Sequence, residues 1–298
     1  MTDWQSVHRP VLLKETLEIL DPQPNENYID ATFGEGNFSF QLINYIRPNG
    51  KVLAFEWDPE LYRLGLEKIK KMKEKNIKLV NENFKKIKKV VKKEKFWEIK
   101  GIVFDLGVSR WHYEKSKRGF AFKKDEPLDM RINPQEIKIT AFDIINYFGY
   151  EELIKILKDY GEEEKAEMIA KEIVERRKVK KIETTKELAE IVAQVKRGFK
   201  KIHPATKTFM ALRIFINKEL ENLKLGLEEA FDILTKGGKI VIISFHGLEN
   251  KVIKSFIKKY KNQKQIEVLT KKAIKPSLEE KKSNPSSRSA ILRAIKKI

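Results

Sequence analysis

The chain has 298 residues, of which 41% are hydrophobic and 10% aromatic; this composition excludes a disordered protein and predicts one large or two smaller domains with a real core. It contains no cysteine, which excludes disulfides, a thiolate nucleophile and a Cys-based zinc site, and its four histidines show no metal-ligand spacing, so we expect no metal. The formal net charge of +19 favours a polyanionic partner.

The start of the chain predicts an amphipathic helix over residues 10–20, which begins at Pro10 and ends at Asp21-Pro22. We find no signal peptide before this helix, and no apolar run of the chain reaches membrane length. The sequence therefore predicts a cytoplasmic protein without membrane contact.

Residues 28–38 have the pattern of a nucleotide-binding turn. A β-prone run ends at Asp30, the chain passes through Gly34 and Gly36, and a helical pattern follows; the next strand ends at Glu56, twenty positions after Gly36. Gly34 permits a tight turn, Gly36 lets a ligand approach the backbone, and Glu56 can accept two ribose hydroxyls. These residues predict a β-turn-α-β unit that binds a nucleotide.

Details of this turn indicate which nucleotide is bound. The third glycine of a dinucleotide fingerprint is replaced by Ser39, and Asp30 and Glu35 flank the turn, which disfavours a pyrophosphate. S-adenosyl-L-methionine, with an adenosine and a positive centre, fits better. The spacing Asp30-x3-Gly34-x-Gly36, with an acid at the end of the next strand, is typical of Rossmann-like methyltransferases. An ordinary glycine turn in an α/β protein is the alternative that this stretch alone leaves open.

Further along the chain, strand and helix patterns alternate, which predicts a parallel sheet. The alternation breaks from about residue 111 to 206, where helical patterns dominate. The helices that we expect lie at 59–75, 85–94, 140–158, 162–177, 184–196, 209–234 and 248–260, and the strands at 77–80, 101–107 and 239–245, with a closing antiparallel pair at 265–270 and 289–295. We therefore predict an α/β fold with a Rossmann-like class I methyltransferase core, residues 1–111 and 207–298, and an inserted helical substrate-recognition domain, residues 112–206.

Sequence blocks along nearly the whole chain resemble those of one family. They are His8–Leu13, Asp105–Ser109, Arg118–Phe122, Pro127–Arg131, Tyr160–Glu163, His203–Phe209, Ser244–Glu249, and Asn284-Pro285 with Arg288-Ser289. On these blocks the chain resembles the MraW/RsmH family, methyltransferases that act on cytosine N4 in small-subunit ribosomal RNA. The family also contains an inserted helical domain, in agreement with the break in the pattern.

The resemblance implies a set of cofactor contacts for S-adenosyl-L-methionine. They fall on Gly36, Asn37, Phe38, Glu56, Phe84, Asp105 and His112. Several of these residues depart from the family, which commonly has Gly-Gly-His at 36–38, Asp at 56 and Ser-Ser-Pro-Gln at 109–112. Phe38 cannot replace the hydrogen bond of an imidazole, and His112 would stand in for an amide.

The chemistry of the implied reaction suggests a catalytic residue. The lone pair of cytosine N4 is delocalised into the ring, so an acceptor for the N4–H helps to draw it out while positioning aligns the reacting atoms. Asp105 is the candidate acceptor; contact with the cofactor, or a role that only caps its loop, are the alternatives.

Three further residues are candidates for substrate contact: His246, Asp129 and Arg131. His246 follows a strand at the edge where ligands bind in open sheets, although it would equally cap the next helix. Asp129 and Arg131 are read either as a structural ion pair or as a base or phosphate contact. Trp111 and Phe120 are candidates to stack on a flipped cytosine, with a place in the core as the alternative.

Positive charge concentrates in two segments. Residues 68–100 hold 14 Lys and 4 Glu, and residues 251–298 hold 15 Lys/Arg and 3 Glu. This charge favours a nucleic-acid partner, and the resemblance implies an rRNA (cytosine-N4) methyltransferase that acts near the ribosomal decoding centre, with 16S rRNA or the small ribosomal subunit as partner, as a monomer or homodimer. The alternatives are a non-catalytic RNA-binding ribosome-assembly factor with a drifted cofactor loop, and a DNA amino-methyltransferase, which the missing Pro-Pro-aromatic motif disfavours.

Overall fold

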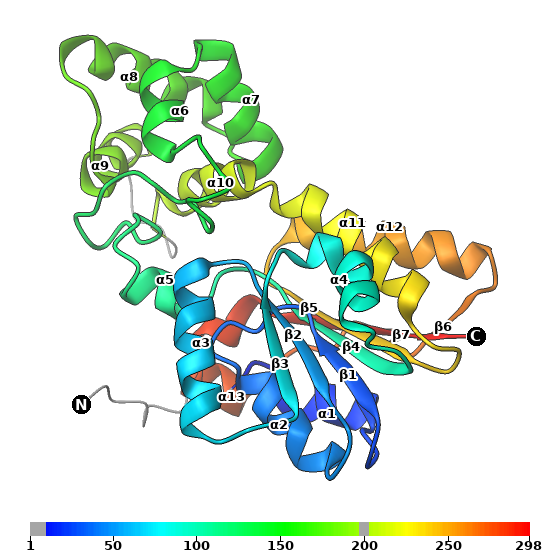
Figure 1. Ribbon diagram of the computed structural model, residues 1–298. Helices are drawn as coiled ribbons and strands as arrows, with labels where there is room; N and C mark the ends of the chain where they lie inside the picture. The colour runs from blue at the N-terminus through cyan, green and yellow to red at the C-terminus, as the bar shows by residue number, and fades with distance from the viewer. Residues whose placement is uncertain (1–9, 197–202) are drawn as a thin grey trace. The chain divides into compact units, whose positions relative to one another are not determined.

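The computed structural model describes residues 10–196 and 203–298 (Figure 1). The chain divides into two compact units, one made of Met1–Val108 with Leu220–Ile298 and the other of Ser109–Glu219. His8 and Arg9, which open the first family block, lie outside the described residues. Each unit is described by itself below.

The first unit is built on a seven-stranded sheet with the order β3-β2-β1-β4-β5-β7-β6. The strands are β1 (Asn27–Asp30), β2 (Val52–Glu56), β3 (Ile77–Asn81), β4 (Ile99–Asp105), β5 (Lys239–Ser244), β6 (Ile266–Val268) and β7 (Ile291–Lys297). The first five strands run parallel, and β7 pairs antiparallel with both β5 and β6. The predicted antiparallel closure of a parallel sheet is confirmed, and with it the class I methyltransferase fold.

Helices cover both faces of this sheet (Figure 1). They are α1 (Leu13–Leu20), α2 (Asn37–Ile46), α3 (Pro59–Lys71), η1 (Phe84–Lys86), α4 (Ile87–Glu94), α11 (Glu219–Ile233), α12 (Gly247–Asn262), α13 (Leu278–Ser283) and η2 (Pro285–Ser289). Side chains of α4, α11 and α12 pack on one face, and those of α1, α2 and α3 pack on the other.

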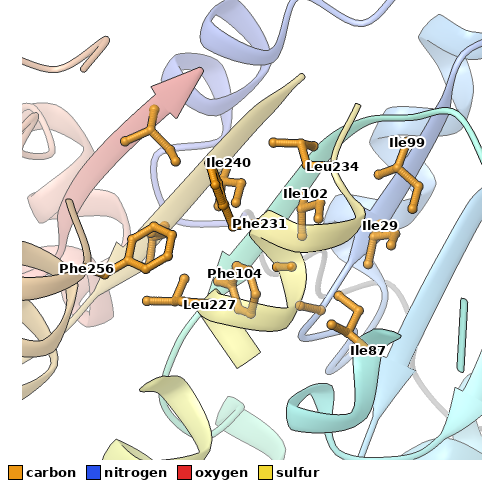
Figure 2. Close-up of a cluster of buried hydrophobic side chains, with 14 of the residues drawn as sticks. Ile29, Ile87, Ile99, Ile102, Phe104, Leu227, Phe231, Leu234, Ile240 and Phe256 are labelled. Carbon is orange, nitrogen blue, oxygen red and sulfur yellow. The ribbon is translucent and has the colours of Figure 1, made fainter. Parts of the chain in front are cut away.

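Alternation along each central strand supplies both cores. In β2, Leu53 and Phe55 enter the cluster under α4 and α11, whereas Val52 and Ala54 enter the opposite one, as the two-residue period of a strand requires. Figure 2 shows the first cluster, in which the labelled side chains are Ile29, Ile87, Ile99, Ile102, Phe104, Leu227, Phe231, Leu234, Ile240 and Phe256. Each such side chain contributes roughly 1.5–3 kcal/mol when fully buried, so the sheet gives the strand ends a rigid support.

The strand order also determines where a ligand can bind. From β1 the chain adds β2 and β3 on one side, and then crosses to add β4 and β5 on the other. The order therefore reverses between β1 and β4, and in open α/β sheets ligands bind at such a reversal, outside the carboxyl ends of the strands.

The second unit is helical. It contains α5 (Arg110–Glu114), α6 (Ala141–Tyr147), α7 (Tyr150–Gly161), α8 (Ala166–Val179), α9 (Thr185–Val195) and α10 (Thr206–Asn217), which enclose a core of their own. The helix predicted over 140–158 is wrong as a single element, because the chain is extended at Phe148 and Gly149 and α7 begins with a new capping arrangement.

The predicted helix over 209–234 is also two helices. Lys218 takes a left-handed conformation with φ of 50°, which ends α10. The apolar side chains of α10, among them Phe209, Leu212 and Ile216, belong to the core of the second unit, where α10 packs against α7. The unit therefore ends at Glu219 and begins at Ser109, instead of the predicted 112–206.

Among the helices in the described ranges, none has both the length and the apolar character needed to cross a bilayer.

Candidate active site

Three adjacent parallel strands end in an acid. β1 ends at Asp30, β2 at Glu56 and β4 at Asp105, and these strands are neighbours in the order β2-β1-β4. The carboxyl ends of parallel strands meet at one edge of a sheet, so the fold collects three carboxylates at the edge where the strand order reverses.

Asp30 is fully buried and held by its own loop. Ser39 Oγ donates to Asp30 Oδ2 over 2.7 Å, and the backbone N–H of Thr32 donates to Oδ1 over 3.1 Å. Burial raises the pKa of Asp30 to about 6, although these donors oppose the shift. Ser39, which replaces the third glycine of a dinucleotide fingerprint, thus supports the acid that ends β1.

Both carboxylate oxygens of Glu56 accept hydrogen bonds from backbone N–H groups. Its Oε2 accepts from the N–H of Gly34 over 2.9 Å, and its Oε1 accepts from the N–H of Asp58 over 2.8 Å. Burial raises the pKa of Glu56 to about 8. Each carboxylate oxygen has a further lone pair, so the predicted contact with two ribose hydroxyls is compatible with these bonds.

Asp105 differs from the other two acids. Its backbone N–H donates to Thr32 Oγ1 over 2.7 Å, which joins the end of β4 to the loop after β1. The residue is partly exposed, but Oδ1 is sealed from solvent and accepts no hydrogen bond from any described residue. Burial, followed by repulsion from Asp30 and Glu249, raises the pKa of Asp105 well above its usual value. A buried acceptor without a donor is costly, and this one lies at the edge where a ligand is expected.

The loop between β1 and α2 requires its glycines. Gly34 and Gly36 have positive φ values of 54° and 80°, and a Cβ on Gly36 would lie 2.5 Å from Cζ of Phe33. Asn37 follows as the first residue of α2, and Phe38 is buried in the core beneath that helix. Phe38 thus contributes packing beneath α2, and cofactor contacts by Gly36, Asn37 and Phe38 stay predictions.

Phe84 opens the turn after β3. The side chain of Asn83 accepts from the N–H of Lys85 over 3.0 Å and so caps this turn. The Phe84 ring packs edge-on against Phe104 with centroids 5.5 Å apart, and a Cβ on Gly226 would meet it at 2.5 Å. The ring is therefore held firmly, and its contact with the cofactor stays a prediction.

His112 belongs to the second unit, within α5. Its ring lies between those of Trp111 and Phe120, with centroids 5.4 and 5.0 Å away, and Ser109 Oγ lies 3.3 Å from Nδ1. Trp111 and Phe120 are themselves buried, so in this structure they form core packing instead of an open stacking surface. A cofactor contact by His112 stays a prediction.

The substrate candidates make structural contacts. His246 is the N-cap of α12: its Nδ1 accepts from the N–H of Glu249 over 3.4 Å, while the Glu249 carboxylate accepts from the N–H of His246 and, over 2.7 Å, of Phe245. The spacing His246-x-x-Glu249 was the available signal for this capping box. Glu249 also helps to shape the electrostatics around Asp105, a role that the sequence analysis missed.

Asp129 and Arg131 form a bidentate ion pair. Arg131 Nε and Nη2 donate to the two carboxylate oxygens of Asp129 over 2.7 and 2.8 Å, and Nη1 donates to the carbonyl of Ile137 over 3.2 Å. Hydrogen bonding to Asp129 raises the pKa of Arg131. The pair holds this loop together, and substrate contact by either residue stays a prediction.

The donor and acceptor set at the strand ends fits S-adenosylmethionine. Asp30, Glu56 and Asp105 have no ion-pair partner in the part of the chain that the structure describes. A ligand with a sulfonium, an ammonium group and ribose hydroxyls supplies the positive charge and the donors that this edge lacks.

Known proteins resemble the chain over nearly its full length. Residues 5–298 match the model of the MraW methylase family. Ribosomal RNA small subunit methyltransferase H of Sulfurihydrogenibium sp. (strain YO3AOP1) is 46% identical over 98% of this chain and 99% of the relative, and its namesake from Ehrlichia chaffeensis is 41% identical over 98% and 100%. An rRNA methylase structure from Streptococcus thermophilus covers 98% of each chain with a TM-score of 0.46 at 12% identity, and nothing below rests on that distant likeness.

The family match and the relatives confirm the resemblance read from the sequence blocks, together with the methyltransferase class and its cofactor, S-adenosylmethionine. The chain belongs to the MraW methylase family.

Proposed function

We propose that the chain transfers a methyl group from S-adenosylmethionine to the N4 amine of a cytidine in 16S rRNA near the decoding centre. It would act in the cytoplasm on free rRNA or on the small ribosomal subunit, as a monomer or homodimer. The relatives that are 40–46% identical over nearly the whole chain, all with the name of small-subunit rRNA methyltransferase, carry this proposal.

Each acid at the strand ends has a role in this reaction. S-adenosylmethionine supplies a methyl group that its sulfonium already activates. Glu56 accepts the ribose hydroxyls, and Gly36 gives the loop between β1 and α2 the positive φ that its turn requires. Asp30 holds the loop in place through Ser39 and Thr32.

Asp105 is the proposed acceptor for the target amine. Its Oδ1 is a buried carboxylate oxygen that accepts no hydrogen bond from a described residue, and a hydrogen from N4 would satisfy it. Withdrawing this hydrogen directs the nitrogen lone pair towards the methyl group. With its raised pKa, Asp105 can also take the proton that the amine loses on methylation.

Exposed lysines on α4 support an RNA partner. Lys89, Lys92 and Lys93 are exposed and make no ion pair with a described residue, whereas Lys88 is paired with Asp232. Phosphate contacts release counterions, so the logarithm of affinity falls by about 0.7 per contact for each tenfold rise in salt. Replacing these three lysines by alanine should flatten this slope by about 2 if all three contact phosphates.

The decisive experiment is nucleoside mass spectrometry of 16S rRNA from cells with and without the gene, followed by methylation of the unmodified rRNA with purified protein. We expect N4-methylcytidine to disappear without the gene and to return with the enzyme. A DNA strand of the same sequence serves as the competing substrate. Methylation at C5, or of the DNA strand alone, would contradict the proposal.

Calorimetry separates catalysis from a purely structural role in ribosome assembly. Glu56→Ala should lower the affinity for S-adenosylmethionine at least tenfold, about 1.4 kcal/mol in binding free energy, because a ribose contact is lost. Glu67→Ala, on an exposed part of α3, is the matched control and should bind normally. If ligand-free wild-type protein gives no heat with the cofactor, the non-catalytic assembly factor becomes the better interpretation.

A further inference from the structure

A cavity of about 460 Å³ opens on the second unit, and the function proposed above does not use it. It lies between the loop at 122–125, one side of α9, and His203. The residues that line it are Phe122, Lys123, Lys124, Asp125, Lys186, Ala189, Glu190, Ala193 and His203. All of them belong to the helical unit, and the volume is in the range of small-molecule sites.

One wall of the cavity is a pair of stacked rings. Phe122 and His203 are stacked with centroids 4.3 Å apart and an interplanar angle of 18°. Behind them, Phe209 meets Phe122 edge-on at 5.4 Å and is buried in the core of the unit. His203 Nδ1 accepts from the N–H of Ala205 over 3.2 Å, which fixes the ring and leaves the hydrogen of a neutral imidazole on Nε2. The pair is thus a supported aromatic platform with His203 on its exposed side.

The rim of the cavity is charged. Lys123 and Lys186 are exposed and have no ion-pair partner among the described residues, while Lys124 Nζ donates to the carbonyl of Glu114. The carboxylates of Asp125 and Glu190 lie on the same lining and are also exposed. The site therefore combines a planar stacking surface, two free cations and two acceptors.

We propose that this cavity binds one unpaired nucleotide of the substrate RNA. The base stacks on His203, as single-stranded bases do on aromatic side chains. Lys123 and Lys186 hold the adjoining phosphates, and Asp125 and Glu190 accept hydrogen bonds from the exocyclic amine of the base. This inference rests on the proposed function, because it supplies a contact for the RNA outside the strand ends where the methyl group is transferred.

The two carboxylates would make this site selective among the four bases. Adenine, cytosine and guanine carry an exocyclic amine that can donate a hydrogen bond to Asp125 or Glu190, whereas uracil carries no such amine. A phosphate-only surface would bind all four bases alike, since phosphate contacts carry no sequence information.

Fluorescence anisotropy with the full-length protein and labelled oligo(C) and oligo(U) RNA tests the proposal. We expect oligo(C) to bind more tightly than oligo(U). His203→Ala should weaken oligo(C) binding about 5- to 100-fold through lost stacking, and His203→Phe should restore most of it. Replacing both Lys123 and Lys186 by alanine should weaken binding and reduce its salt slope by about 1.4.

The matched control replaces Lys155 and Lys171, two exposed lysines elsewhere on the helical unit, and should leave RNA binding unchanged. Calorimetry with S-adenosylmethionine should give the same affinity for every variant. Equal RNA affinity of His203→Ala and wild type would overturn the inference, and so would an equal loss in the control pair. Failure of the proposed function looks different: the wild type would bind RNA and cofactor without methylating rRNA.

Discussion

The two units differ in whether their buried charged side chains have an ion-pair partner. In the first unit, Asp30, Glu56 and Asp105 end adjacent strands without an ion-pair partner among the described residues, and burial raises the pKa of each. In the second unit, the two most buried charges form a pair: Lys196 Nζ lies 2.6 Å from Glu163 Oε2, with side chains only 7% and 2% exposed. Glu126 of this unit is also buried and accepts from the backbone N–H of Gly119.

This difference separates the charges of a binding site from those of a scaffold. An unpaired buried carboxylate destabilises the fold unless a ligand or a proton offsets it. A buried pair is already balanced within the chain, and no ligand is needed. Three acids that end adjacent strands without an ion-pair partner among the described residues thus point to a ligand, whereas the Lys196–Glu163 pair of the helical unit has a structural role.

Breaking the buried pair should have the largest effect. Glu163→Gln leaves the Lys196 ammonium buried without a counter-charge, with a neutral amide oxygen and the carbonyl of Pro204 as its acceptors. We expect a loss of about 3–5 kcal/mol in the free energy of unfolding, measured by urea denaturation followed by circular dichroism. The exposed neighbour Glu164 is the control, and Glu164→Gln should change stability by less than about 0.5 kcal/mol. A loss below about 1 kcal/mol for Glu163→Gln would show that this pair is not structural.

Neutralising an acid of the first unit should have the opposite effect on stability. Asp105→Asn replaces a carboxyl group whose charged form is disfavoured by burial and by Asp30 and Glu249, so the ligand-free protein should be at least as stable as wild type. Methyl transfer should fall about 100-fold, because the amide is a weaker acceptor for the target amine and cannot take its proton. Thermal melting and single-turnover methylation measure the two effects, with Asp159→Asn, an exposed change, as control. Lower stability with unchanged activity would assign Asp105 a capping role.

The sequence was sufficient to predict the sheet and its acids. Strand runs with two-residue alternation or continuous apolar character, separated by helices, specify a parallel sheet whose carboxyl ends coincide. Asp30, Glu56 and Asp105 each end such a run, so their meeting at one edge followed from local patterns alone. The cofactor loop was equally readable, because only glycine readily takes the positive φ found at Gly36.

Features that depend on distant contacts were missed. Apolar spacing continues across Lys218, and lysine carries no signal for a left-handed residue, so the end of α10 and the unit boundary were misplaced. Glu163 and Lys196 are 33 residues apart, and only the packing of the helices brings them together. Ser39 was considered only as a missing glycine, and its bond to Asp30 depends on the turn geometry.

The raised pKa of Glu56 predicts a pH-dependent cofactor affinity. In the ligand-free protein Glu56 titrates at about 8, so it is mostly protonated at pH 7. Ribose hydroxyls donate to the carboxylate and lower its pKa in the complex, so binding releases a proton. The affinity should therefore rise with pH up to about 8, at most tenfold per unit, and then level off. Calorimetry between pH 6 and 9 measures this, and Glu56→Gln should remove this rise.

The half-buried pair in the second unit should give the smallest effect. Asp129 and Arg131 are bidentate, but their side chains are 21% and 20% exposed, so solvent screens the pair. Asp129→Asn should cost about 1 kcal/mol in unfolding free energy and leave RNA affinity unchanged if the pair only holds the loop. The control is Glu172→Gln, which removes an exposed ion pair with Arg176 and should cost less. A drop in RNA affinity with an unchanged free energy of unfolding would instead identify Asp129 and Arg131 as a substrate contact. The paired charges of this unit would then not all be structural.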